Sequence, residues 1–177
     1  MKIKLFAYGE AHHGTHNDEI KKVLNQSKNI NGIFLEMSVS FQKHFDEYIK
    51  TGIFSDRIEQ YIRGASKEGN DIRNQLELIF NFSKDNNVPL IFIDSSKEEE
   101  GDYQKKSSIG NWYLKGESRD EDMFNTIKEY VEKSPGGYVL FAGSNHLVNG
   151  VHGRSNSVSL GQRLKDWLEE EVKIKIF

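Results

Sequence analysis

The segment Tyr8–His16, with the sequence YGEAHHGTH, combines side chains that commonly carry acid/base chemistry. Glu10 and His13 stand three positions apart, soon after an apolar run, and Gly9 and Gly14 flank them. A histidine with a pKa near neutrality can take a proton from water, and a neighbouring carboxylate can orient its ring. The glycines allow sharp turns and the close approach of a ligand. The segment therefore predicts a functional turn with Glu10 and His13 as its working pair, and the other histidines as neighbours.

Acidic, amide and imidazole side chains also stand at the ends of the other apolar runs. Glu36 ends the run IFLE, Asp94 ends PLIFID, and Asn145 and His146 follow YVLFAGS. If these runs are parallel strands, their carboxyl ends share one edge of a sheet. We therefore expect these groups to converge in space although they are far apart in the sequence.

Two kinds of chemistry suit such a cluster, and the spacing does not choose between them. A metal-free scheme uses a histidine as general base, whereas a one-metal site holds a divalent ion and keeps a position open for water. The candidates in both cases are Glu10, His13, Glu36 and His146. The chain has no cysteine, so a thiolate nucleophile is excluded. It also lacks the GxSxG, GxxxxGK[ST] and GxGxxG patterns, which disfavours a serine nucleophile and those nucleotide-binding loops.

Strand-like and helix-like segments alternate along the chain and must position these residues. Strands are expected at Ile3–Tyr8, Gly32–Glu36, Pro89–Asp94, Tyr138–Ala142 and Val172–Phe177, the last as an edge strand. Helices are expected at Asn17–Ser27, Phe41–Lys50, Ser55–Arg63, Asp71–Asn86, Asp120–Lys133 and Leu160–Glu171. The alternation predicts a three-layer α/β fold with a mostly parallel sheet of five strands, helices on both faces and the site at the strand carboxyl ends.

Length and charge restrict the classes of protein that remain. The 177 residues suit a single domain, residues 1–177. The net charge of −3 and the interspersed charges provide no basic stripe, so we expect no nucleic-acid partner. No apolar run has the length of a signal or a membrane span, which favours a cytoplasmic protein that does not bind membranes. A small-molecule or peptide substrate is expected, and the oligomeric state stays open.

Two polar segments, 95–118 and 147–159, each follow an expected strand and could overhang the same sheet edge. His152 and Arg154 in the second segment are either solvated or close over a ligand. Together with the strand-end residues, they complete the candidate substrate-binding set of Asp94, Asn145, His152 and Arg154.

Five short motifs, in order along the chain, resemble those of one superfamily. GEAHHGT resembles the GExxHGT opening of erythromycin esterase-like proteins, which are grouped with ChaN-type haem-binding lipoproteins and TraB/Tiki proteins. FLEM resembles the second acidic position and places Glu36, and RDEDM, from Arg119, resembles the RDxxM signature at a helix start. FAGSNHL resembles the GxxH motif and places His146, while SLGQRL, from Ser159, resembles the SMGxxL ending of the esterase branch.

The resemblance implies an α/β fold whose site is lined by Glu10, His13, Glu36, Arg119 and His146. In the esterase branch, a histidine after the first strand is taken to activate water against an ester carbonyl. In the Tiki branch comparable residues hold a divalent metal for peptide hydrolysis, and ChaN-type members bind haem. Arg119, with its fixed charge, would stabilise an oxyanion or fix a carboxylate. The chain is much shorter than macrolide esterases, so the resemblance leaves the substrate open.

These observations predict a small hydrolase that uses a Glu/His cluster to activate water against an ester or amide. One alternative is a binding module that holds haem or a metal ion without turnover. Another is the catalytic domain of a toxin or secreted effector.

Overall fold

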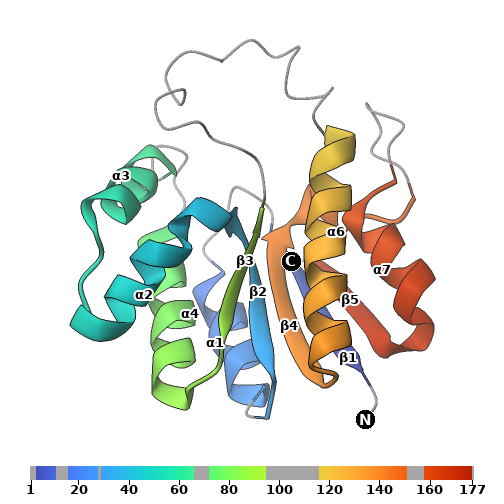
Figure 1. Cartoon of the computed structure of the whole chain (residues 1–177), viewed down its shortest axis with the longest axis horizontal. Coiled ribbons are helices and arrows are strands. Elements are labelled where there is room, and N and C mark those ends of the chain that lie inside the picture. Colours follow the sequence, from blue (N-terminus) through green and yellow to red (C-terminus); the bar gives the residue numbers. More distant parts are fainter. Residues whose placement is uncertain are drawn as a thin grey trace.

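A five-stranded parallel sheet lies between two layers of helices (Figure 1). The computed structural model describes residues 3–10, 16–27, 29–65, 72–94, 116–150 and 158–176. The strands are β1 (Lys4–Glu10), β2 (Gly32–Ser38), β3 (Leu90–Asp94), β4 (Gly137–Gly143) and β5 (Val172–Ile176). Their spatial order is β3-β2-β4-β1-β5, and all neighbouring pairs are parallel. The predicted three-layer α/β fold is confirmed.

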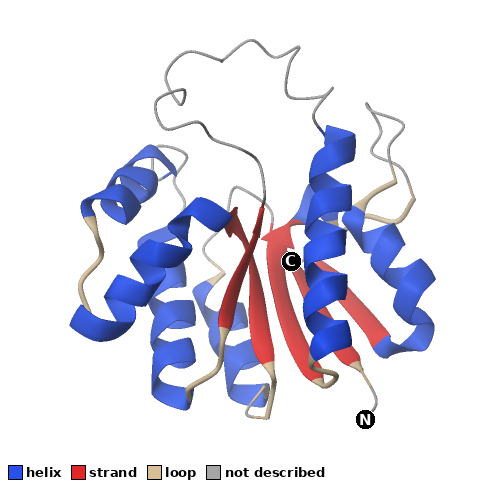
Figure 2. Cartoon of the chain, in the orientation of Figure 1, coloured by secondary structure: helices blue, strands red, loops and turns tan. Residues whose placement is uncertain are grey.

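Helices cover both faces of the sheet, as Figure 2 shows. The α-helices of the described chain are α1 (Asn17–Gln26), α2 (Gln42–Thr51), α3 (Asp56–Ala65), α4 (Ile72–Asn86), α6 (Gly116–Lys133) and α7 (Leu160–Leu168). Three short 3₁₀ turns are η1 (Val39–Phe41), η4 (Ser144–His146) and η5 (Glu169–Glu171). All six expected helices are present, but α6 begins four residues earlier than predicted and α7 ends three residues earlier. No described helix is long and apolar enough to span a membrane.

The alternation of side chains along each strand divides the core into two parts. Ile33 and Leu35 of β2 pack in the cluster formed with α1, α2, α3 and α4, whereas Phe34 packs in the cluster formed with α6 and α7. Because both faces of every central strand are covered, these strands are apolar almost throughout. Each large side chain that becomes buried contributes about 1.5–3 kcal/mol. This rigid sheet fixes the positions of the strand ends.

The connections between strands leave the sheet edge toward opposite faces. The helices that follow β1 and β2 belong to the first layer, and those that follow β3 and β4 belong to the second. In the order β3-β2-β4-β1, neighbouring strands are therefore followed by helices on opposite sides. Ligands of open α/β proteins bind beyond the carboxyl ends of strands at such switch points.

The two edge strands are protected differently. β3 is buried along its whole length, and the side chain of Gln42 covers its backbone, donating to the carbonyl of Leu90 and accepting from the amide of Phe92. β5 is the expected exposed edge, with Lys173 and Lys175 pointing to solvent. Lysines on an edge strand discourage pairing with another chain.

Candidate functional site

Five charged side chains form a continuous chain of hydrogen bonds and ion pairs at the carboxyl edge of the sheet, which we call the charge network. One terminal nitrogen of Arg119, Nη2, donates to Glu36 Oε1 at 2.7 Å and to Asp94 Oδ2 at 2.8 Å. His146 Nε2 lies 3.2 Å from the same oxygen of Glu36. On the other side of its ring, His146 Nδ1 lies 2.5 Å from Asp120 Oδ1. The order of the network is therefore Asp94, Arg119, Glu36, His146 and Asp120.

Four different elements contribute these side chains. Glu36 lies near the end of β2 and Asp94 ends β3, while His146 ends the turn η4 that follows β4. Arg119 and Asp120 are consecutive residues in the first turns of α6. Of the strand-end groups, Glu36, Asp94 and His146 converge as expected. Helix α6 links them, because Arg119 binds Glu36 and Asp94 while the adjacent Asp120 binds His146.

Glu36 is held as a carboxylate at the centre of the network. Its second oxygen accepts a hydrogen bond of 2.6 Å from the backbone amide of Gly143. Burial alone raises the pKa of Glu36, but the hydrogen bond and charge of His146, with the charge of Arg119 and the Gly143 amide, outweigh it and lower the pKa to about 2. A carboxyl group with this pKa stays ionised at neutral pH and is a weak base.

His146 is held as an imidazolium ion. Burial lowers its pKa, but the hydrogen bonds and charges of Asp120 and Glu36 outweigh burial and raise the pKa to about 9. Both ring nitrogens then carry protons and donate, one to each carboxylate. At neutral pH this histidine provides positive charge and donated hydrogen bonds, and it cannot accept a proton.

Arg119 is the second cation of the network. Its side chain is 27% exposed, and although burial opposes its charge, Glu36 and Asp94 raise its pKa further. Its Nε–H is buried without a hydrogen-bond partner in the described part of the chain. The guanidinium therefore retains donor capacity beyond the two carboxylates that it holds.

Asp120 belongs to the network although the sequence reasoning did not select it as a site residue. Its side chain is fully buried, and its Oδ2 accepts a hydrogen bond of 3.0 Å from the amide of Leu160. It thereby joins His146 to the first turn of α7. A signal was present in the sequence, because Asp120 lies at helical spacing from Met123 and Ile127 on the buried stripe of α6. A carboxylate on such a stripe requires a buried partner.

The turn that carries His146 is fixed by close backbone packing. A Cβ atom at Gly161 would lie 2.6 Å from the carbonyl oxygen of Leu147, and one at Gly9 would lie 3.1 Å from Cα of Ser144. Ser159 caps α7 by accepting from the amide of Gln162, and its hydroxyl donates to the carbonyl of Val148. The glycine and serine of the SLGQRL motif therefore both position the chain around η4.

The remaining predicted residues are placed as follows. Asn145 is exposed on η4 and makes none of the network contacts described above. Glu10 is the last residue of β1, and its backbone pairs in register with Gly143. Its side chain is not described, and His12, His13, His152 and Arg154 lie outside the described residues. His16 is the N-cap residue of α1, and its side chain makes no capping hydrogen bond.

The described residues do not fit a metal ion or a haem iron at this point. Within the described ranges, no three acidic or imidazole side chains are arranged to hold a metal. Each ring nitrogen of His146 faces a carboxylate oxygen, of Asp120 or of Glu36. Glu36 is likewise committed to Arg119, His146 and Gly143.

The fold and the site together define a three-layer α/β protein with a buried charge network at the carboxyl edge of its sheet. Comparison with family models, curated proteins and solved structures gave no significant match to this chain.

Proposed function

We propose that this chain is a small hydrolase of the erythromycin esterase-like, ChaN and TraB/Tiki superfamily, which activates water against an ester or amide carbonyl. The observation that carries the proposal is the charge network, because it holds two cations, Arg119 and His146, in fixed positions between three carboxylates at the edge where α/β proteins bind ligands. Glu10 pairs in register with Gly143, and the amide of Gly143 binds Glu36. The GEAHH segment therefore begins directly beside the network.

The protonation states within the network support the following roles. His146 carries its proton at neutral pH and Glu36 is too weakly basic, so neither is the base that activates water. We assign that role to His13, with Glu10 as the carboxylate that orients it. Glu36 holds the two cations in place.

Arg119 supplies the donor that the reaction requires, because its Nε–H has no hydrogen-bond partner in the described part of the chain, and His146 adds positive charge beside it. As water attacks a carbonyl carbon, negative charge develops on the carbonyl oxygen, and preorganised cationic donors stabilise it. Asp94 positions Arg119, and Asp120 positions His146. The proposal routes no step through a metal or haem, because the network residues are bound to one another.

The test is hydrolysis of p-nitrophenyl acetate and of a matched anilide by the purified chain. His13→Ala is expected to lower kcat by at least about 100-fold, which is typical for loss of a general base. His12→Ala is the matched control and should retain activity. Circular dichroism and the melting temperature of both variants show whether the fold is intact. Hydrolysis by the His13→Ala variant at the unsubstituted rate, or no hydrolysis by the unsubstituted chain, would overturn the proposal.

A further inference from the structure

Helix α7 begins against the charge network and lies beside α6 on one face of the sheet (Figure 1). The first amides of a helix have no partner within the helix and require others. In α7, the amide of Leu160 donates to Asp120 Oδ2 at 3.0 Å, and the amide of Gln162 donates to the hydroxyl of Ser159 at 3.1 Å. The amino end of α7 therefore brings a donor, and the positive end of its helix dipole, to the carboxylate that holds His146.

Ser159 ties this end of α7 to the segment that follows His146. Its side chain is fully buried, and its hydroxyl donates to the carbonyl of Val148 at 2.6 Å while it accepts from Gln162. Its backbone amide donates to the carbonyl of Gly150 at 3.0 Å. The side-chain oxygen of Gln162 accepts from the amide of Gly150, also at 3.0 Å. These hydrogen bonds join the start of α7 to the chain just after η4.

The contacts of Ser159 and of Asp120 form a closed ring. Val148 follows His146 by two residues, and Leu160 directly follows Ser159. Asp120 bridges the same two parts from the other side, because it binds the ring of His146 and the amide of Leu160. A shift of α7 relative to η4 would lengthen one of these two bonds. The hydrogen bond from Ser159 to Val148 opposes such a shift, and capping of α7 does not require it.

We infer that Ser159 is a positioning residue for His146, since its buried hydroxyl keeps α7 and η4 in the arrangement in which Asp120 holds the proton on Nδ1. Ser159 acts through Leu160 and Asp120. The inference rests on the proposed function for its link to catalysis, because that function places His146 beside Arg119 to add positive charge. The serine of the SLGQRL motif thereby has a role in the site as well as in the helix cap.

The Nδ1 proton of His146 reports on this arrangement directly. A proton held at 2.5 Å between an imidazole and a carboxylate gives an NMR signal at low field and exchanges slowly with water. Ser159→Ala should move this signal upfield and make its exchange about tenfold faster, the effect of losing one good hydrogen bond. With p-nitrophenyl acetate, kcat should fall by about tenfold and KM should change little.

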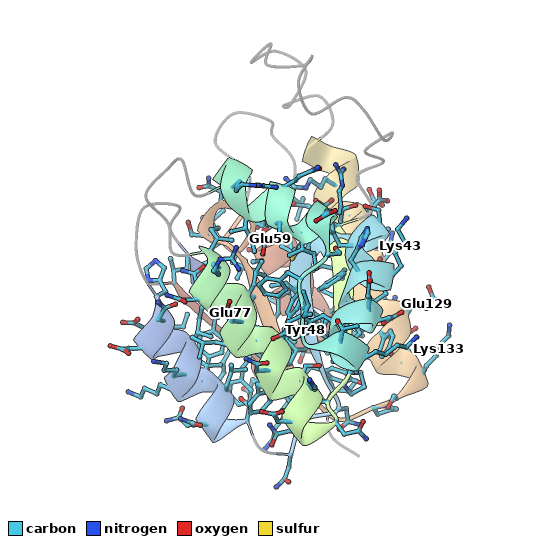
Figure 3. All side chains as sticks on the ribbon, turned by 90° about the vertical axis from the view of Figure 1, so that its left-hand side faces the viewer. Lys43, Tyr48, Glu59, Glu77, Glu129 and Lys133 are labelled. Carbon is cyan, nitrogen blue, oxygen red and sulfur yellow. The ribbon has the colours of Figure 1, made fainter. Side chains whose placement is uncertain are left out.

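Ser55→Ala is the matched control on the opposite face of the sheet. Ser55 directly precedes α3 and accepts from the amide of Ile58 at 3.4 Å. Figure 3 views the chain from this side, with Glu59 of α3 labelled. Each alanine variant loses a hydrogen bond at a helix start and should lower the melting temperature by at least about 2–4 °C. Only Ser159→Ala should change the His146 signal and kcat.

Two further variants keep the test decisive. Ser159→Gly removes the same hydroxyl at a position where helix caps tolerate glycine, and it replaces Ser159→Ala if that variant does not fold. Ser159→Thr keeps the hydroxyl and should keep the signal.

An unchanged His146 signal or an unchanged kcat after loss of the hydroxyl would overturn the inference. Equal loss of the signal in Ser159→Thr and Ser159→Ala would also overturn it, because the effect would then arise from packing. If the signal responds as expected but the unsubstituted chain hydrolyses no ester or amide, the proposed function fails and the positioning of His146 by Ser159 stands.

Discussion

Asp120 and His146 form a buried pair that links three elements of the fold. Asp120 Oδ1 lies 2.5 Å from Nδ1 of His146, and Asp120 Oδ2 accepts from the amide of Leu160. One carboxylate therefore joins α6 to η4 and to the first turn of α7. Since Asp120 is fully buried, its negative charge requires these donors, and the histidine must keep a proton on Nδ1 to provide one.

Removing the charge of Asp120 should lower the pKa of His146. In Asp120→Asn, the amide cannot stabilise the imidazolium as a carboxylate does, so the pKa should fall from about 9 toward the ordinary value of 6.5. NMR titration of the imidazole signals measures this change. His44 of α2 lies outside the network and serves as an internal reference whose titration should not move. An unchanged pKa of His146 would show that Asp120 does not hold the proton on the ring.

The position of the site could be predicted from the sequence because it follows from topology. Glu36, Asp94 and His146 stand at or just after the ends of apolar runs, and parallel strands bring such ends to one edge. Arg119 became a candidate site residue only because it begins the RDEDM motif. The roles within the network could not be predicted, because they depend on which nitrogen meets which oxygen. His146 was a candidate for catalysis or metal binding, and only its two carboxylate partners make it a fixed cation.

One residue of the charge network escaped prediction because helical patterns describe a face and not its contacts. Asp120 lies on the buried stripe of α6 and could have been recognised as a polar residue on a buried face. Its partners, His146 and Leu160, come from distant elements, and helical spacing carries no information on them.

Stability should depend on pH through the Glu36–His146 pair. Glu36 has a lowered pKa in the folded chain, so its contribution is present above pH 4.5 and is lost as the pH falls toward about 2. His146 has a raised pKa, so its contribution is present below pH 6.5 and is lost as the pH rises through about 9. For this pair, stability should be greatest between about pH 4.5 and 6.5.

Urea unfolding at a series of pH values measures this dependence. The loss between pH 6.5 and 9 should be on the order of 3 kcal/mol, since each pKa unit corresponds to about 1.4 kcal/mol and Asp120 and Glu36 together raise the pKa of His146. His146→Gln should flatten the alkaline part of the profile between pH 6.5 and 9. An equally steep alkaline loss in that variant would assign the dependence to other groups.

Arg119→Gln should destabilise the fold more than loss of an exposed arginine. The substitution leaves Glu36 and Asp94 without the guanidinium that they share, so the pKa of Glu36 should rise and about 2 kcal/mol of stability should be lost. Arg73→Gln is a matched control, because Arg73 pairs with Glu59 but its side chain is 43% exposed. Its loss should cost less than about 1 kcal/mol. Chemical denaturation measures both variants, and equal losses would contradict a special role for Arg119.

Gly161→Ala should disturb the turn that carries His146. A methyl group at this position would lie 2.6 Å from the carbonyl oxygen of Leu147, which is backbone and cannot move aside without shifting η4. We expect a loss of about 1–3 kcal/mol, typical of overpacking, together with changed NMR shifts of the His146 ring. Gly64→Ala in α3 is the matched control, because a Cβ atom there meets nothing within 4 Å. Since alanine favours helix over glycine by up to about 1 kcal/mol, that variant should be slightly more stable than the unsubstituted chain. Similar melting temperatures for the two variants would show that η4 is not held by the contact between Gly161 and Leu147.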